Sequence, residues 1–125
     1  MITTLTPNPS LDRTMIIEEL VRGAVIRAQR NWTEPAGKGV NISRALAANG
    51  IATRAVLPIG GASGEELCRL LEASGVDFTP VPVAGSIRSN LSVVEPDGAT
   101  TKLNEAGPTL TADEVDALIE AVVQA

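Results

Sequence analysis

EPAGKGVNISRALAANGIATRAVLPIGG, residues 34–61, is the stretch that decides the fold of this chain. Its first half predicts a helix from Gly39 to Asn49, and Gly50 stands where helices commonly end on a left-handed residue. Its second half, from Ala52 to Ile59, is an apolar run of the kind that forms a buried strand. A helix that leads directly into a buried strand indicates an α/β fold in which helices connect parallel strands.

The same alternation continues on both sides of this stretch. Upstream, Ile2 to Leu5 is a short β-prone run that ends before two prolines. Downstream, Ser63 and Glu66 match a capping box that opens a second helix, and Gly75 ends this helix before an extended run from Val76 to Val83. The order strand, helix, strand, helix, strand predicts parallel βαβ units with right-handed crossovers.

Further elements follow from local patterns. Thr14 to Ile17 and Ala24 to Gln29 predict two short peripheral strands on either side of Gly23. Thr111 to Glu114 is a second capping box, and it opens a final amphipathic helix. No repeat or low-complexity linker divides the chain, so we expect residues 1–125 to belong to one domain.

Two runs around Pro96-Asp97-Gly98 predict a β-hairpin, because a three-residue loop that ends in glycine is a common hairpin turn. The runs are Ile87 to Glu95 and Ala99 to Glu105. If Glu95 pairs with Ala99, one face of the hairpin is rich in hydrogen-bond donors and the other is apolar. The donor-rich face carries Arg88, Asn90, Ser92, Lys102 and Asn104, and the apolar face carries Ile87, Leu91, Val93 and Leu103.

The composition excludes several classes of function. The chain has 125 residues and a net charge of −5 without a basic block, so nucleic acid is not an expected partner. With one cysteine, Cys68, and no histidine, it offers no internal disulfide, no zinc site and no imidazole catalysis. No apolar stretch has the length of a membrane span, and the N-terminus lacks the pattern of a signal peptide. We therefore expect no membrane partner and a cytoplasmic location.

Gly37-Lys38-Gly39, directly ahead of the first helix, is a candidate anion site. The N-terminus of a helix has unpaired N–H groups and a partial positive charge, and a lysine adds to that charge. The turn is not a nucleotide P-loop, because Gly39 and Trp32 occupy the positions of the required Ser or Thr and glycine. Asn41 offers a donor and an acceptor to the same region. A flexible turn with a solvated lysine explains the composition equally well.

Asp12 and Arg88 are candidates for a functional site only in combination with other residues. Taken alone, Asp12 is an ordinary loop carboxylate after Asn8-Pro9-Ser10. Arg88 is either a solvated strand residue or, with its predicted neighbours Asn90 and Lys102, part of an anion site.

Four motifs, in this order and spacing, resemble the N-terminal part of the ribokinase-like sugar kinases of the PfkB family. They are Thr6-Pro7-Asn8-Pro9-Ser10-Leu11-Asp12, Pro35-Ala36-Gly37-Lys38-Gly39-Val40-Asn41, Arg88-Ser89-Asn90 and Thr101-Lys102-Leu103-Asn104-Glu105. The resemblance covers nearly all of the chain. It implies a three-layer α/β/α sandwich, of which residues 1–125 are the N-terminal part, with a small β-sheet lid formed by residues of about 11–33 and 87–105.

The resemblance also implies ATP-dependent phosphorylation of fructose 1-phosphate to fructose 1,6-bisphosphate, with Mg²⁺, in a homodimer formed through the β lid. Arg27 is the implied lid residue that reaches substrate in a partner subunit. Lys102, Asn104 and Glu105 are further candidates for the substrate site. The implied substrate-binding residues are Asp12 for sugar hydroxyls, Gly37, Lys38, Gly39 and Asn41 for the phosphate end and hydroxyls of the sugar, and Arg88 and Asn90 for the phosphate and its surroundings.

The chain departs from the family pattern in two respects. Ala36 stands where the family usually has a glycine, which requires Ala36 to keep a negative φ. None of its aspartates follows a Gly-x-Gly-Asp motif, which carries the catalytic base in the family. We therefore expect the base and the ATP site to lie beyond residue 125, and the chain alone to be inactive.

Three alternatives stay open. They are a kinase of the same family for tagatose 6-phosphate, a kinase for fructose 6-phosphate, and a non-catalytic fragment that binds a sugar phosphate or serves in assembly. The motif from Thr101 to Glu105 favours fructose 1-phosphate.

Overall fold

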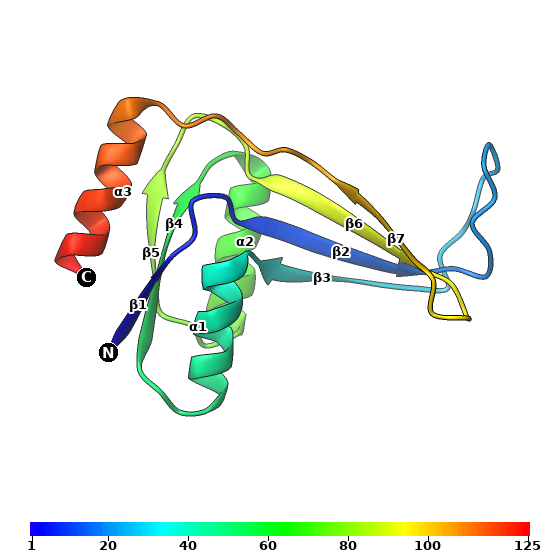
Figure 1. Cartoon of the computed structure of the whole chain (residues 1–125), viewed down its shortest axis with the longest axis horizontal. Helices are drawn as coiled ribbons and strands as arrows, with labels where there is room; N and C mark the ends of the chain where they lie inside the picture. The colour runs from blue at the N-terminus through cyan, green and yellow to red at the C-terminus, as the bar shows by residue number, and fades with distance from the viewer.

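The computed structural model describes residues 1–125. Its body is a parallel three-stranded sheet with helices on both faces (Figure 1). One face is covered by α1 (Lys38–Ala48) and α2 (Gly61–Ala73), and the other by α3 (Ala112–Gln124). The strands lie in the order β1 (Ile2–Leu5), β4 (Thr53–Ile59) and β5 (Phe78–Pro82).

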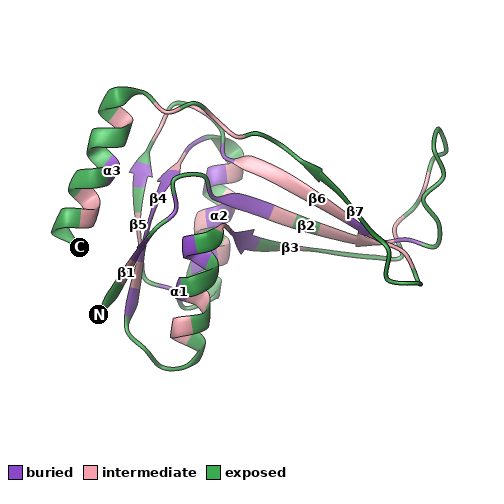
Figure 2. Cartoon of the chain, viewed as in Figure 1, coloured by how far each residue is buried: buried purple, intermediate pink, exposed green.

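Strand β4 lies between the two helical layers and is therefore buried on both faces (Figure 2). Ala55 and Leu57 belong to the same core cluster as Leu67 of α2, whereas Val56 packs with Leu118 of α3. Alternate residues of a strand point to opposite faces, and strands covered on both faces are apolar almost throughout. This is why the apolar run after the first helix predicted a buried strand.

A second sheet forms a lid that extends from the body (Figure 1). Strands β2 and β6 pair in parallel at its centre, and the two outer pairs are antiparallel. The body and this sheet together are the sandwich and lid expected from the sequence. The four strands lie in the order β3 (Arg30–Ala36), β2 (Ser10–Ile16), β6 (Arg88–Val94) and β7 (Thr100–Asn104).

The predicted hairpin and its register are confirmed. Asn90 pairs with Asn104 and Ser92 with Lys102, so the donor-rich face exists as expected. The N–H of Glu95 donates to the carbonyl oxygen of Ala99 at 3.0 Å, which closes the turn. The apolar face is only partly covered, because Leu103 lies on the edge strand β7 and is 61% exposed.

The two strands predicted between residues 14 and 29 are placed differently. The first begins earlier, at Ser10, so Asp12 lies in a strand and not in a loop. The second prediction, residues 24–29, is wrong: they belong to the loop between β2 and β3, where Val25 is 90% exposed. The partner strand is β3, which contains Pro35. An edge strand tolerates proline and polar side chains, so β3 lacks the pattern of a half-buried strand.

Of the two predicted capping boxes, the one at Thr111 is confirmed and the one at Ser63 is wrong. Thr111 Oγ1 accepts from the N–H of Glu114 at 3.1 Å, and Glu114 Oε1 accepts from the N–H of Thr111 at 2.9 Å. Helix α2 begins earlier, at Gly61, whose φ of +70° turns the chain into the helix. The Ser63 hydroxyl instead donates to the carbonyl oxygen of Ile87 at 2.7 Å, which ties α2 to the start of β6.

The ends of the first two helices agree with the sequence. Gly50 and Gly75 both have φ of +72° after α1 and α2. The N–H of Ile51 donates to Leu46 O at 2.9 Å, and the N–H of Val76 donates to Leu71 O at 3.3 Å. Such bonds back to the last turn are typical of helices that end on a glycine with positive φ. No helix in the fold is both long and apolar enough to cross a bilayer.

We predict that Glu114→Gln lowers the free energy of unfolding at neutral pH and flattens its decline in acid. Hydrogen bonds from the N–H groups of Thr111 and Ala84 lower the pKa of Glu114 from its ordinary value. The stabilisation is therefore present above the pKa of the unfolded chain and is lost as the pH falls through the lowered value. Urea unfolding at neutral pH and at about pH 3.5 measures this difference.

Glu65→Gln is the matched control, because Glu65 is exposed and accepts no hydrogen bond. Equal pH dependence of unfolding in the two variants would contradict the role given to Glu114.

Candidate functional site

Two strands from distant parts of the sequence place Asp12 beside Asn90. In the parallel pair β2 and β6, Asp12 lies opposite Asn90 and Ser10 lies opposite Arg88. Asp12 Oδ1 accepts hydrogen bonds from Ser10 Oγ at 2.7 Å and from Asn90 Nδ2 at 3.3 Å. Its other oxygen, Oδ2, accepts none from the chain. One carboxylate oxygen is therefore available on the donor-rich face of the lid.

Three buried polar atoms in this part of the fold have no hydrogen-bond partner: Thr6 Oγ1, Arg88 Nε and Asn90 Oδ1. Folded proteins pair nearly all such atoms with protein groups, water or ligand. Arg88 also donates from Nη2 to the carbonyl oxygen of Asn8 at 3.2 Å, which holds its guanidinium against the turn before β2. The unpaired atoms mark the base of the lid, where β2 and β6 leave the body, as a place for a polar ligand.

The predicted anion turn lies at the same base. Strand β3 ends at Ala36, which pairs with Ser10, and α1 begins directly afterwards at Lys38. Ala36 keeps a negative φ, as its place in the motif requires. The N–H of Asn41 donates to Gly37 O at 2.8 Å, so the N–H groups of residues 38–40 form the open first turn of the helix. The side chains of Lys38 and Asn41 are exposed.

The two glycines of this turn have a packing role that the sequence did not reveal. A Cβ atom at Gly37 would lie 2.5 Å from Thr6 Cγ2, and Gly37 has φ of +126°, which L side chains rarely adopt. A Cβ atom at Gly39 would lie 2.9 Å from the carbonyl oxygen of Leu5 and would also meet Thr6 Oγ1. The glycines thus let α1 begin against the end of β1. Sequence reasoning missed Thr6, whose only signal was its place in the first motif.

The candidates on β7 lie farther out. Asn104 continues the row of Asp12 and Asn90 onto the edge strand, and Lys102 lies in the next row toward the tip of the lid. Glu105 Oε1 accepts from the N–H of Ser89 at 2.5 Å, so this carboxylate joins the ends of β6 and β7. A surface hollow of about 480 Å³ adjoins the site and is lined by Arg88, Glu105 and residues 85–87 and 106–109.

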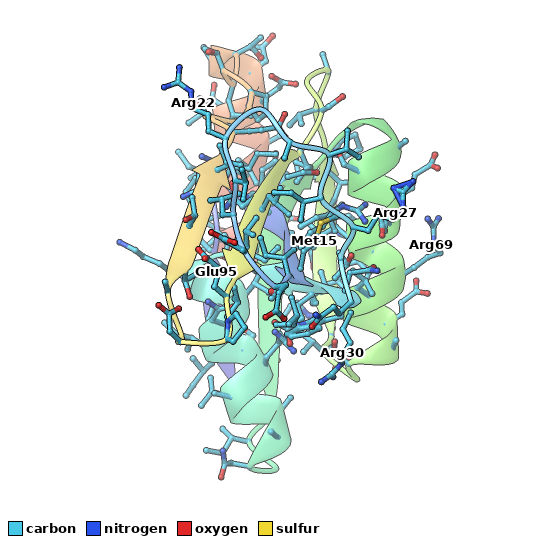
Figure 3. The ribbon with its side chains drawn as sticks, turned by 90° about the vertical axis from the view of Figure 1, so that its right-hand side faces the viewer. Met15, Arg22, Arg27, Arg30, Arg69 and Glu95 are labelled. Carbon is cyan, nitrogen blue, oxygen red and sulfur yellow. The ribbon has the colours of Figure 1, made fainter.

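Arg27 is not brought to the site of its own chain. It lies in the loop between β2 and β3, at the end of the lid farthest from the body (Figures 1 and 3). Its side chain is exposed and makes no hydrogen bond. Arg22 belongs to the same loop, and Figure 3 shows it on the opposite side from Arg27. The lid therefore carries a positively charged side chain at its tip, Arg27, as well as one at its base, Arg88.

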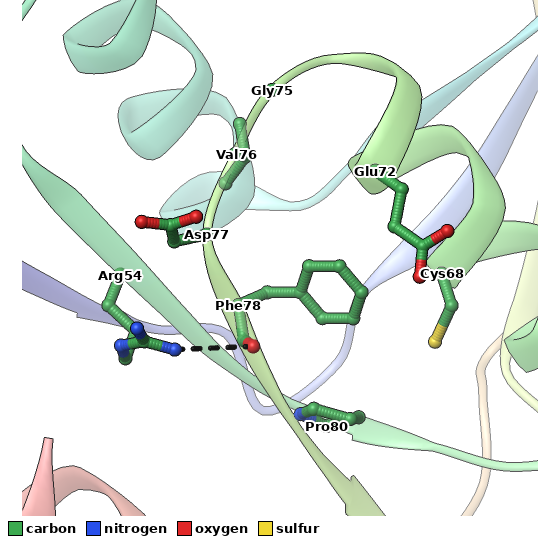
Figure 4. A pocket seen from close by; sticks show the side chains of 8 residues that line it. All are labelled: Arg54, Cys68, Glu72, Gly75, Val76, Asp77, Phe78 and Pro80. Atoms are coloured by element: carbon green, nitrogen blue, oxygen red, sulfur yellow. Dashed lines mark hydrogen bonds between the residues drawn. The ribbon is translucent and has the colours of Figure 1, made fainter.

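A second hollow, of about 550 Å³, lies beside α2 and β5, away from the lid (Figure 4). Arg54 Nη1 is held there by the carbonyl oxygen of Phe78 at 3.5 Å. Burial raises the pKa of the Cys68 thiol in its wall, which reduces the thiolate fraction and its reactivity. None of the unpaired buried polar atoms belongs to this wall. The hollow is lined by Arg54, Cys68, Glu72, Gly75, Val76, Asp77, Phe78 and Pro80.

Comparison with known sequences finds one matching family and several similar proteins. A family model described as pfkB family carbohydrate kinase matches residues 6–125. The 1-phosphofructokinase of Bacillus subtilis is 32% identical over 120 residues, which cover 96% of this chain and 39% of that protein. The ATP-dependent 6-phosphofructokinase isozyme 2 of Escherichia coli is 36% identical over 124 residues, which cover 98% of this chain and 40% of that protein.

Solved structures agree with these relatives. Phosphofructokinase-2 from E. coli, in complex with fructose-6-phosphate, matches 99% of this chain and 41% of its own with a TM-score of 0.93 at 34% identity. A possible 1-phosphofructokinase from Thermotoga maritima has a TM-score of 0.88 at 29% identity, over 97% of this chain and 40% of its own. The chain thus spans about two fifths of the length of the relatives it matches. By sequence and by fold, it belongs to the PfkB family of carbohydrate kinases.

Proposed function

We propose that this chain is the N-terminal, substrate-positioning part of a kinase that phosphorylates fructose 1-phosphate at its 6-hydroxyl to give fructose 1,6-bisphosphate. The supporting observation is the arrangement at the base of the lid. Asp12 leaves Oδ2 without a partner, its neighbour Asn90 leaves Oδ1 unpaired, and Arg88, which lies opposite Ser10 on the adjacent strand, leaves Nε unpaired. A free carboxylate oxygen suits sugar hydroxyls, and an adjacent guanidinium suits a phosphate.

Positioning is the contribution that these residues make to the reaction. Phosphoryl transfer depends mainly on alignment and on electrostatic stabilisation. Asp12 would accept hydrogen bonds from sugar hydroxyls and so align the attacking oxygen. Arg88 and Lys38 would neutralise the phosphate that does not react, beside the open first turn of α1. The lid sheet would exclude water from the bound sugar.

Neither ATP nor Mg²⁺ is assigned to residues of this chain. No group of three or more His, Cys, Asp or Glu side chains gathers where it could hold a metal ion. Its residues therefore do not fit a Mg²⁺ site by themselves. We propose that the nucleotide, the metal ion and the catalytic base belong to polypeptide outside residues 1–125.

Fructose 6-phosphate is the second candidate substrate, because the relative with fructose-6-phosphate bound has a TM-score of 0.93 against this chain. Fructose 1-phosphate and fructose 6-phosphate each carry a phosphate at one end of the sugar and a primary hydroxyl at the other. The same carboxylate and the same cations therefore suit both. Tagatose 6-phosphate differs from fructose 6-phosphate in the orientation of one ring hydroxyl. Measuring kcat/KM for each of the three sugar phosphates decides which of them is the substrate.

We further propose that two copies of the chain associate through their lids. Arg27 lies in the loop beyond the end of β2, whereas Asp12 lies near the start of that strand, and the loop around Arg27 carries exposed apolar side chains. A lid packed against a second lid buries these side chains and brings Arg27 near the partner's sugar site. The exposed apolar residues of this loop are Leu20, Val21 and Val25, and Trp32 is exposed beside it on β3.

We expect the 125-residue chain by itself to transfer no phosphate from ATP to fructose 1-phosphate. The catalytic base and the nucleotide site are absent from it under this proposal, and loss of a catalytic unit lowers rates by orders of magnitude. An ADP-release assay on material free of host kinases measures this, with the B. subtilis relative as the positive control. ADP release above the rate without enzyme would overturn the expectation. The non-catalytic alternative would be favoured if the chain binds the sugar phosphate and a longer protein that contains the chain also transfers no phosphate.

In the complete kinase, Lys38→Ala and Arg88→Ala should each raise KM for fructose 1-phosphate about tenfold to a hundredfold, the range expected for hydrogen bonds to charged groups. The phosphate they contact does not react, so its binding is similar in the ground state and the transition state, and kcat should change little. Asp12→Ala should lower kcat as well, because it disturbs the alignment of the attacking oxygen. Steady-state kinetics distinguishes the two patterns.

Arg69→Ala is the matched control, since Arg69 is exposed on α2 and makes no hydrogen bond. If KM is unchanged in both Lys38→Ala and Arg88→Ala, the phosphate site has been misplaced.

Arg27→Ala should raise KM while leaving the dimer intact, because its proposed contact is with substrate in the partner's site. Arg22→Ala is the control from the same loop. KM for fructose 1-phosphate, together with the mass in solution measured by light scattering, tests this. A monomeric and fully active kinase, or equal effects of the two variants, would rule out the arrangement.

A further inference from the structure

We propose that Ser10 is a positioning residue: its hydroxyl holds the Asp12 carboxylate so that Oδ2 faces the sugar. The inference rests on the proposed function, since it concerns how Asp12 aligns its substrate. Ser10 and Asp12 are two residues apart on β2, so their side chains lie on the same face of the lid. Ser10 Oγ lies 2.7 Å from Asp12 Oδ1, a distance typical of an O–H···O⁻ hydrogen bond.

The Ser10 hydroxyl makes no other hydrogen bond. It has one proton, and Asp12 Oδ1 is the acceptor within reach. Ser10 is 1% exposed, so it lies beneath the surface on which a ligand would rest and acts on the ligand only through Asp12. A buried hydroxyl that serves a single carboxylate oxygen is suited to fixing the orientation of that carboxylate.

A second donor reaches the same oxygen from the neighbouring strand. Asn90 Nδ2 lies 3.3 Å from Asp12 Oδ1, which is longer than the Ser10 contact. Both donors act on Oδ1, so the carboxylate has one oxygen held from within the fold and one left for a ligand. Asn90 also presents an unpaired Oδ1 to the site, whereas Ser10 has no second role.

Orientation matters here because the terminal torsion of an aspartate is broad and roughly two-fold. Without the shorter of its two hydrogen bonds, the Asp12 carboxylate samples orientations in which Oδ2 no longer points at the sugar hydroxyls. Small errors in the alignment of reacting groups lower the rate of the chemical step more than they weaken binding. Loss of the Ser10 hydroxyl should therefore act mainly on kcat.

The test uses the complete kinase and the variant Ser10→Ala. We expect kcat for fructose 1-phosphate to fall about tenfold, the size of effect expected for one hydrogen bond to a charged group, while KM changes less than about threefold. Ser43→Ala is the matched control: Ser43 is equally buried, and its hydroxyl bonds only to the hydroxyls of Thr4 and Thr53. It should lose stability but keep kcat. Thermal unfolding of each variant separates the two effects.

Ser10→Cys covers the case in which Ser10→Ala does not fold. The thiol fills nearly the same space but is a weak donor, so the protein should fold and kcat should still fall. A double variant then tests whether Ser10 acts through Asp12. In the Asp12→Ala background, Ser10→Ala should have no further effect on kcat.

Wild-type kcat in both Ser10 variants, or the full tenfold loss persisting in the Asp12→Ala background, would overturn the role of Ser10 while leaving the proposed site in place. If Asp12→Ala itself leaves kcat and KM unchanged, the proposed function fails and the positioning role fails with it. The single variant at Asp12 therefore tells the two failures apart.

Discussion

The parallel pairing of β2 with β6 is the constraint on which the rest of the site depends. It brings together segments whose contacting side chains, Asp12 and Asn90, are 78 residues apart in the chain. Its register also sets Ser10 opposite Arg88, so the carboxylate, its two donors and the guanidinium share one face of the lid. A shift of one residue would turn every side chain of one strand to the other face and separate the set.

The joint between lid and body depends on close backbone packing. Gly37 and Gly39 lack the Cβ atoms that would meet Thr6 and Leu5 at the end of β1. Helix α1 therefore starts against the parallel sheet, and its open first turn faces the base of the lid. Close packing of this kind would hold the parts of the proposed binding site in a fixed relation, which alignment of a substrate requires. The structure itself shows only the packing role of the two glycines.

The unpaired polar atoms concentrate where this joint meets the lid. Arg88 Nε and Asn90 Oδ1 are buried without partners, whereas the polar groups elsewhere in the core, such as the Thr4, Ser43 and Thr53 hydroxyls, bond to one another. Burying a polar group without a partner costs free energy, so a fold keeps such groups only where something else satisfies them. This contrast within one small chain distinguishes the candidate site from the ordinary polar interior.

Local signals in the sequence determined the helices, the parallel strands and the hairpin register. Apolar runs, Gly50 and Gly75, the Thr111 capping box and the Pro96-Asp97-Gly98 turn act over a few residues, so their physical cause is present in the sequence itself. Family motifs predicted Asp12, Lys38 and Arg88 as one set of candidate site residues.

Only the tertiary structure decided which residues touch. Strand β3 is polar and contains Pro35, and it forms because β2 offers it an edge to pair with, a partner that no local pattern announces. Ser63 was available as an N-cap, but the turn at Gly61 started α2 earlier and left the hydroxyl to bind Ile87. The contact of Asn90 with Asp12 and the packing of Thr6 against the glycines likewise depend on elements far apart in the chain. Such contacts form only when distant segments are brought together, because the free energy that selects them comes from burial and pairing across the fold.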